Sequence, residues 1–193
     1  KIHRNTSWDE ARFESCGQKW MDMSEGHYGV SLLNDCKYGH SALDGVMTLT
    51  LIKSGIEPNP TADQEEHTFT YALYPHAEGW RQANTVQEAM KLNQPLLSEE
   101  GGHAGCQNSF VWVDKSNVII ETVKMAEDDD GIIVRLYESE NAKTKAHIFF
   151  GEKISSVESC NCLEEIKQTI ETDGEGFEIT VKPYEIQTYR VRF

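Results

Sequence analysis

Short stretches in which apolar and polar residues alternate at every second position recur along this chain. The alternation is clearest over residues 28–33, 45–52 and 67–74, and a weaker version runs over residues 12–23. Because successive side chains of a β-strand point to opposite faces, this two-residue period predicts a strand at each of these places. The apolar residues that share one face of the stretch at 67–74 are Phe69, Tyr71 and Leu73.

The second half of the chain carries shorter apolar stretches at even spacing. Acidic and glycine-containing turn sequences separate several of them, among them residues 128–131 and 173–174. Short strands joined by such turns are typical of an antiparallel β-sandwich. In the last stretch the apolar phase shifts near Thr188, and we expect a β-bulge there. The predicted strands of this half are residues 110–113, 118–123, 132–137, 147–151, 177–181 and 185–193.

One short helix interrupts the strands. Thr85 followed by Glu88 has the form of a capping box, and apolar residues then recur at helical spacing until Gln94 and Pro95 end the run. Residues 56–63 contain two prolines and are predicted as a loop, because proline cannot donate to a strand ladder. The glycine-rich segment 98–105 is predicted as a boundary between one domain at residues 1–105 and a second at residues 106–193.

Charge and hydropathy narrow the classes of partner. The chain has 193 residues, with 18 Lys and Arg against 32 Asp and Glu, for a net charge of -14. This charge repels phosphate backbones and anionic lipid, so we expect neither nucleic acid nor membrane as a partner. No apolar run reaches the ~18 to 20 residues of a membrane span, and the start does not have the form of a signal peptide. We expect a soluble product that is part of a longer protein.

The cysteines indicate the compartment. There are five, an odd number without the spacing of a disulfide framework, which favours reduced thiols and a cytoplasmic location. The triplet Asn5-Thr6-Ser7 matches a glycosylation site, which we predict to be unused because a secretory signal is missing. The cysteines are Cys16, Cys36, Cys106, Cys160 and Cys162.

Polar residues that could take part in binding or catalysis follow the strand at 28–33. Asn34, Asp35, Lys37 and Tyr38 crowd together directly after the apolar run. Asn34 and Asp35 can stabilise a turn by bonding nearby backbone N–H groups, which needs no further function. Turn formation alone does not require Lys37 or Tyr38, so the second interpretation is a loop that lies close to a substrate. Both interpretations stay open from sequence alone.

No other cluster predicts a catalytic or metal site. Residues 128–131 lack the acidic first position and the final glutamate of a calcium loop. Cys160 and Cys162 have no second cysteine pair at the spacing of a zinc site, and we predict two small strand residues. The seven histidines are scattered, without an HExxH motif. We therefore predict no catalytic residue and no metal ligand in this chain.

Longer strings resemble a known family from one end of the chain to the other. The chain resembles the C-terminal half of the glycoside hydrolase family 38 α-mannosidases, and the cytosolic and bacterial type fits better than the lysosomal type. The strings at 121–127, 131–138 and 182–192 look like the family's last β-domain. The strings that carry the resemblance are NTSWDEARF (5–13), KWMD (19–22), SEG (24–26), YGVSLLNDCKYG (28–39), YALYPH (71–76), ETVKMAE (121–127), GIIVRLYE (131–138) and KPYEIQTYRVR (182–192).

The resemblance implies a fold for this chain and places the catalytic residues in another domain. It implies an all-β chain, in which residues 1–105 form part of a large galactose-mutarotase-like antiparallel β-sandwich and residues 106–193 form a small Ig-like β-sandwich. It places the catalytic zinc, or another divalent metal, and the nucleophilic aspartate in an N-terminal domain outside this chain. The expected partners are that catalytic domain and a mannose-containing saccharide. A half-enzyme without its catalytic domain should expose an apolar patch, so we also expect association into a homo-oligomer through the N-terminal half.

Three functional classes follow. The chain can be a non-catalytic region that supports the catalytic domain of an α-mannosidase and completes the rim of its pocket. It can instead be a carbohydrate-binding module, which requires an exposed aromatic platform, or an independent glycosidase with two carboxyl groups about 5 Å apart. Its four tryptophans, Trp8, Trp20, Trp80 and Trp112, can stack on sugar rings or pack in a core.

Overall fold

The structure is a computed structural model that describes residue 7, residues 13–98, residue 100 and residues 109–193. The chain forms two compact units, unit 1 at Lys1–Glu100 and unit 2 at Gly101–Phe193. The boundary predicted at residues 105 and 106 lies outside the described residues, as does Cys106. No helix among the described residues is both long and apolar enough to cross a membrane.

The described residues of unit 1 form two three-stranded sheets and the helix α2. One sheet has the order β1-β4-β5 and the other the order β2-β3-β6, and all of their pairs are antiparallel. The elements are β1 (Ser15–Cys16), β2 (Trp20–Glu25), β3 (Tyr28–Asn34), β4 (Gly39–Leu43), β5 (Val46–Thr50), β6 (Tyr71–Ala77) and α2 (Thr85–Asn93).

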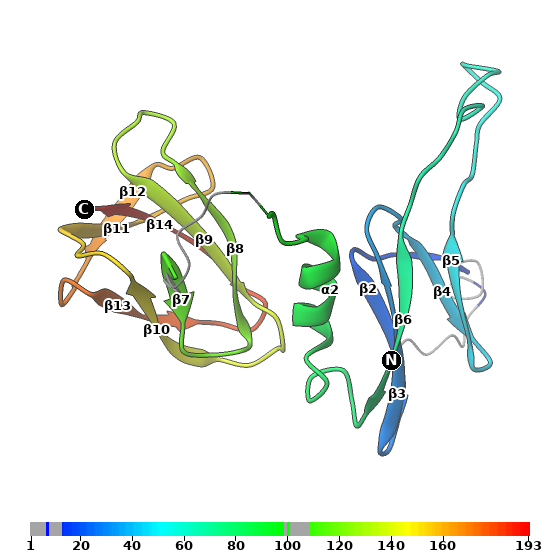
Figure 1. Ribbon diagram of the computed structural model, residues 1–193, viewed down its shortest axis with the longest axis horizontal. Helices are drawn as coiled ribbons and strands as arrows, with labels where there is room; N and C mark the ends of the chain where they lie inside the picture. The colour runs from blue at the N-terminus through cyan, green and yellow to red at the C-terminus, as the bar shows by residue number, and fades with distance from the viewer. Residues whose placement is uncertain (1–6, 8–12, 99, 101–108) are drawn as a thin grey trace. The chain divides into compact units, whose positions relative to one another are not determined.

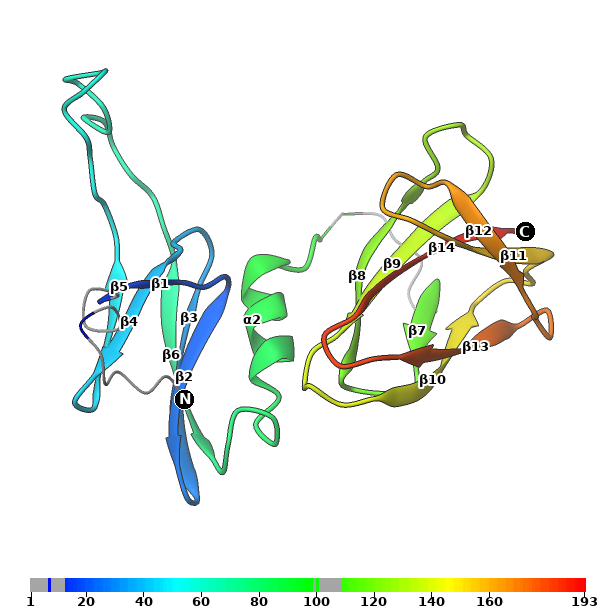
Figure 2. The same ribbon diagram turned by 180° about the vertical axis from the view of Figure 1, so that it is seen from behind.

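These elements stack in three layers. Helix α2 lies along one face of the β2-β3-β6 sheet, and strands β4 and β5 lie on the other side of that sheet, in both Figure 1 and Figure 2. Buried apolar residues between helix and sheet include Val86 and Ala89 of α2 and Leu33 of β3. β6 is an edge strand, and among the described residues its outer edge pairs with no other strand.

Two points of the strand prediction for unit 1 need correction. The single strand predicted at residues 12–23 is wrong, because β1 and β2 are separated by a turn in which Lys19 has a left-handed φ of 67°. β4 was missed because His40 and Ser41 dilute its apolar pattern. The strands predicted at 28–33, 45–52 and 67–74 are confirmed as β3, β5 and β6, with shifted ends.

The predicted helix is confirmed over Thr85–Asn93, but its predicted capping box is wrong. The N-cap residue is Asn84, which has a left-handed φ of 53° and no capping hydrogen bond from its side chain. The hydroxyl of Thr85 instead lies 2.9 Å from the hydroxyl of Ser31 on β3. A tertiary hydrogen bond to the sheet therefore replaces the local one that the sequence favours.

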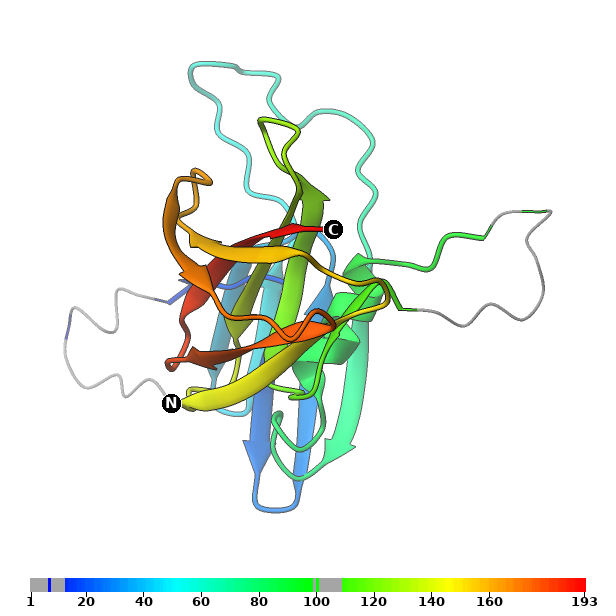
Figure 3. The ribbon, with the colours of Figure 1, turned by 90° about the vertical axis from the view of Figure 1, so that its left-hand side faces the viewer.

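Unit 2 is a sandwich of two antiparallel sheets. The smaller sheet has the order β13-β10-β7, and the larger has the order β12-β11-β14-β9-β8. Figure 1 shows these two sheets, and Figure 3 shows them again after a turn about the vertical axis. The strands are β7 (Val111–Val113), β8 (Val118–Met125), β9 (Ile132–Glu138), β10 (Thr144–Phe150), β11 (Ser156–Cys160), β12 (Ile166–Ile170), β13 (Gly176–Val181) and β14 (Ile186–Arg192).

The inward side chains of these strands form one apolar core. In β10 every second residue is buried, so that Ile148 and Phe150 point into the core while His147 and Phe149 point away from it. Ile148, Val134 and Val191 have no measurable exposed surface. The all-β sandwich predicted for this half of the chain is confirmed.

Three details of unit 2 differ from expectation. The bulge predicted near Thr188 is wrong, because β14 keeps a regular register with both of its neighbours and Ile186 is an exposed residue at its start. Strands β11 and β12 were missed, since β12 is an exposed edge strand with a mostly polar sequence. Cys160 ends β11 and is buried, but Cys162 lies beyond the strand and is exposed.

Candidate functional site

The predicted site residues form the loop after β3, and the first of them is its buried anchor. Oδ1 of Asn34 accepts a hydrogen bond of 2.7 Å from the backbone N–H of Lys37, and Nδ2 lies 3.2 Å from Nε2 of His40. The carbonyl of Asn34 accepts a bond of 3.0 Å from Nδ2 of Asn93 on α2. Asn34 is fully buried, so its side chain shapes the loop from within.

Asp35 joins the loop to the residue that precedes β6. Its Oδ2 accepts a bond of 2.9 Å from the N–H of Thr70. The neighbouring Cys36 side chain and this N–H lower the pKa of Asp35 below its ordinary value, so the carboxylate remains ionised at neutral pH. The side chain of Asp35 lies at the surface.

Lys37 and Tyr38 form the outer part of the loop. Nζ of Lys37 lies 4.8 Å from the centre of the Phe69 ring, a distance at which the cation is attracted to the ring face. Tyr38 is 55% exposed. The structure thus brings the four predicted residues together on one loop, with Asn34 inside and Asp35, Lys37 and Tyr38 toward the surface.

A second polar cluster lies inside unit 1 and was not singled out from the sequence. Oδ2 of Asp22 on β2 lies 2.8 Å from Oγ of Ser31 on β3 and 2.8 Å from Nε2 of His76 on β6. Oγ of Ser31 also lies 3.2 Å from Nε2 of His76. Ser24 donates a further hydrogen bond to Asp22. The side chains of Asp22 and His76 are almost completely buried.

This cluster contains the residue types of a serine triad without its geometry. In a triad the base contacts the serine through one ring nitrogen and the orienting carboxylate through the other. Here Asp22 and Ser31 both lie next to the same nitrogen, Nε2 of His76, so the cluster has no relay for activating Ser31. We assign it to holding three strands and α2 together. The sequence signal for this cluster was Ser31, a polar residue at a buried position of the apolar strand β3.

Metal-binding side chains are scattered over both units. Within residues 7, 13–98, 100 and 109–193, no group of three or more His, Cys, Asp or Glu side chains is arranged to hold a metal ion. A catalytic zinc is held by three protein ligands and keeps one open position. The donor groups of this part of the chain therefore do not fit a catalytic zinc.

Sequence comparisons define the class first. Residues 117–189 match the family model described as "Glycosyl hydrolases family 38 C-terminal beta sandwich domain". Residues 1–61 match the one described as "Glycosyl hydrolases family 38 C-terminal domain". The first match lies in unit 2 and the second in unit 1, and together they cover well over half of the chain. This chain belongs to the C-terminal region of glycoside hydrolase family 38.

Individual relatives carry a more specific name. Alpha-mannosidase G of Dictyostelium discoideum is 37% identical over 196 residues, which is 97% of this chain and 18% of that protein. Human Alpha-mannosidase 2C1 is 38% identical over 167 residues, which is 84% of this chain and 16% of that protein. The chain therefore spans less than a fifth of the length of these two relatives.

A solved structure has the same fold. The crystal structure of an alpha-mannosidase from Enterococcus faecalis V583 superposes with a TM-score of 0.71 at 21% identity, over 92% of this chain and 21% of that one. At this identity the likeness establishes the fold, which agrees with the all-β architecture predicted from the sequence.

Proposed function

We propose that this chain is the C-terminal region of an α-mannosidase, an enzyme that removes terminal α-linked mannose, and that it supports a catalytic domain located elsewhere in the longer protein. The observation that carries the proposal is the 37% identity to an α-mannosidase along 97% of this chain. The zinc, or another divalent metal, and the nucleophilic carboxylate belong in this proposal to the other domain.

A cytoplasmic location forms part of the proposal. Four of the five cysteines lie among the described residues, and these four are free thiols. Free thiols suit a reducing compartment, where disulfides are rare. The free cysteines are Cys16, Cys36, Cys160 and Cys162.

The supporting role rests on the outer surface of β6. Tyr71 is 58% exposed and Leu73 is 68% exposed, on the face of the strand that points away from α2. Exposed apolar residues on an edge strand are typical of a surface that pairs with or packs against another segment. We propose that the remaining part of the longer protein covers this edge and completes the large sandwich.

The loop at Asn34–Tyr38 is the second part of the supporting surface. Its base is fixed by the contacts of Asn34 with α2 and of Asp35 with Thr70, while Tyr38 is left exposed. A loop that is fixed at its base can hold a neighbouring group in place, and misplacement of about 1 Å in such a support can cost roughly a hundredfold in rate. We propose that this loop faces the catalytic domain and helps to close the mannose pocket.

An activity comparison tests the proposed enzyme class. The longer protein should release mannose from an aryl α-mannoside and should lose this activity on removal of its metal with a chelator, while the 193-residue chain should release none. Metal-dependent release by the purified 193-residue chain would contradict the supporting role. A longer protein that hydrolyses other aryl glycosides but not the α-mannoside would contradict the substrate class.

A matched pair of tyrosines tests the loop. Tyr38→Ala in the longer protein should lower kcat/KM by about one order of magnitude, or about 1.4 kcal/mol of transition-state stabilisation, without changing Tm. Tyr28→Ala is the control, because Tyr28 is 57% exposed in the same unit but lies at the other end of β3. Equal kcat/KM for the two variants would leave the loop as a turn.

A further inference from the structure

The outer face of the small sheet in unit 2 carries a row of aromatic rings. Phe149 on β10 pairs with Trp112 on β7, and their ring centres lie 5.4 Å apart with planes inclined by 10°. The ring of Phe149 also lies 4.3 Å from that of His147. Trp112 is 42% exposed. The core is filled by the opposite face of β10, so packing of the sandwich does not require these three rings.

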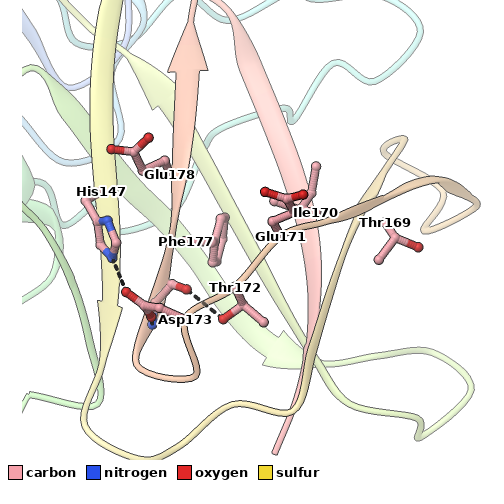
Figure 4. A pocket seen from close by; sticks show the side chains of 9 residues that line it. His147, Thr169, Ile170, Glu171, Thr172, Asp173, Phe177 and Glu178 are labelled. Atoms are coloured by element: carbon pink, nitrogen blue, oxygen red, sulfur yellow. Dashed lines mark hydrogen bonds and ion pairs between the residues drawn. The ribbon is translucent and has the colours of Figure 1, made fainter.

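The row leads into a pocket. The pocket has a volume of about 510 Å³ and lies between β13 and the segment Thr169–Asp173, with His147 at its edge. This volume falls in the ~300 to 1,000 Å³ range of small-molecule sites. Figure 4 shows His147 and Asp173 pointing toward each other, with Glu178 on the neighbouring strand beside His147.

A glycine on β13 allows a close approach to β10 and to His147. Gly176 on β13 pairs with Phe149 across the sheet. A Cβ atom at Gly176 would lie 2.1 Å from the carbonyl oxygen of Ile148 and 2.5 Å from Nε2 of His147. Any other residue would therefore clash with the backbone of β10 and with the His147 ring, so the glycine allows β13 and His147 to lie this close together beside the pocket.

Acidic side chains at the pocket are held in fixed positions. Oδ1 of Asp173 accepts bonds from the N–H groups of Glu175 at 2.9 Å and of Gly176 at 2.8 Å, and these bonds lower the pKa of Asp173. Oδ2 of Asp173 faces Nε2 of His147 at 4.0 Å, which is longer than a hydrogen bond. Glu178 is mostly exposed and pairs with Lys145 at 2.8 Å. Both carboxylates retain acceptor capacity.

We propose that this face of unit 2 is a saccharide-binding subsite, with one pyranose ring stacked on the exposed ring of Trp112 and with hydroxyls of a neighbouring sugar residue that donate hydrogen bonds to Asp173 and Glu178. A sugar combines faces of C–H groups with edges of O–H groups. The negative faces of aromatic rings attract C–H hydrogens, and ionised carboxylates accept hydrogen bonds from hydroxyls.

The charge of the surroundings disfavours anionic ligands. Glu171, Asp173 and Glu178 all line the pocket, and the whole chain carries a net charge of -14. Phosphorylated ligands and nucleotides would be repelled, although their bases could stack on the same rings. The proposal rests on unit 2 alone. The saccharide subsite can therefore be absent while the proposed enzyme class is correct, and the subsite can be present while the proposed enzyme class is wrong.

The test is a titration of the 193-residue chain with mannotriose, followed through the indole N–H signals of its four tryptophans by NMR. We expect a saturable shift of the Trp112 signal alone, with millimolar affinity. Trp112→Ala identifies that signal and should raise the Kd measured by calorimetry at least about tenfold. Asp173→Asn, which keeps an oxygen for the turn, should raise it by a smaller factor.

Two controls make the result decisive. Tyr184→Ala removes another exposed aromatic ring of unit 2 and should leave the Kd unchanged, and circular dichroism should show that all three variants are folded. Glycerol at an equal concentration of hydroxyl groups should produce no shift. The proposal is overturned if mannotriose shifts no indole signal, if glycerol shifts it equally, or if folded Trp112→Ala binds mannotriose with the original Kd.

Discussion

In unit 2 most of the buried side chains are apolar and lie between two sheets, whereas in unit 1 buried polar residues are as prominent as apolar ones. Among the described residues of unit 1, Leu32, Leu33, Val86 and Ala89 are buried together with Ser31, Asn34, His40, His76 and Thr85. Each buried polar group has to find a partner, and in unit 1 these partners lie on different strands and on α2.

This difference has a consequence for what each unit can do alone. A sandwich whose apolar side chains face one another between two sheets has a hydrophobic core of its own, as unit 2 does. The described part of unit 1 buries fewer apolar side chains than unit 2 and also leaves Tyr71 and Leu73 exposed on an edge strand. Unit 2 therefore has the features of a self-contained domain, and unit 1 has those of a domain that is completed by further chain.

The largest expected effect comes from breaking the polar cluster of unit 1. Asp22→Ala leaves His76, Ser31 and Ser24 without their shared acceptor. Each buried group left without a hydrogen-bond partner costs about 1 to 3 kcal/mol, and Asp22→Ala affects both Ser31 and His76, so unit 1 should unfold at a much lower denaturant concentration. Hydrogen exchange read by mass spectrometry in denaturant separates the two units, and exchange in unit 2 should not change.

Glu25→Ala is the matched control, because Glu25 is an exposed residue of the same strand. Its unit 1 should be about as stable as that of the parent protein. Equal stability of Asp22→Ala and Glu25→Ala would show that the polar cluster does not hold unit 1 together.

The second effect concerns acid and should fall mainly on unit 2. Burial raises the pKa of Glu138, but hydrogen bonds from the N–H of Tyr184, from Asn117 and from the N–H of Glu140 outweigh burial, so its pKa lies below the ordinary value. A carboxyl whose folded pKa is lowered stabilises the fold above the unfolded pKa and loses this contribution as pH falls through the folded pKa.

Unit 2 contains several further carboxyl groups with lowered pKa values, while Asp35 is the one such group resolved among the described residues of unit 1. Between pH 5 and pH 3 unit 2 should therefore lose more stability than unit 1, because the ordinary carboxyl values lie near 4. The groups in unit 2 are Asp114, Asp128, Asp130, Glu138, Glu164 and Asp173.

Glu138→Gln isolates one part of this effect. It should cost about 1.5 to 3 kcal/mol at pH 7, because a charged acceptor of three hydrogen bonds is replaced, and it should flatten the loss of stability in acid. Glu152→Gln changes an exposed glutamate and serves as the control. Denaturant melts at pH 7, 5 and 3 check both points, and an acid profile as steep as that of the parent would rule out the assignment to Glu138.

The smallest effect tests the apolar core of unit 2. Ile148→Val removes one methylene from a fully buried residue and should cost about 0.5 to 1.5 kcal/mol. Ile186→Val removes the same group from an exposed residue and should cost almost nothing. If the two variants had the same Tm, the core would be less tightly packed than the structure indicates.

The same contrast explains how far the sequence could predict the fold. The strands with strict alternation were found, as at 28–33, and so was the helix end before Pro95, because both depend on local chemistry. Thr85 was assigned to a helix cap because its partner Ser31 is 54 positions away in the chain. The polar strand β12 carries little apolar signal, and its pairing with β11 is tertiary information.

The candidate site divides in a similar way. The crowding of Asn34, Asp35, Lys37 and Tyr38 after a strand could be read directly, and the structure places all four on one loop. The sequence could not show that Asn34 is buried against His40 and α2, since those contacts come from other elements. The aromatic row of unit 2 was hidden for the same reason, because Trp112 and Phe149 lie on separate strands.

Hydrogen exchange at β6 tests the central claim most directly, namely that unit 1 is completed by the rest of an α-mannosidase. Exchange is compared between the 193-residue chain and the longer protein. We predict that amides of Tyr71–Ala77 exchange at least about tenfold more slowly in the longer protein, because a covered edge strand opens less often, while those of Ile186–Arg192 in unit 2 keep the same rate. Equal exchange rates at Tyr71–Ala77 in both proteins would contradict the claim.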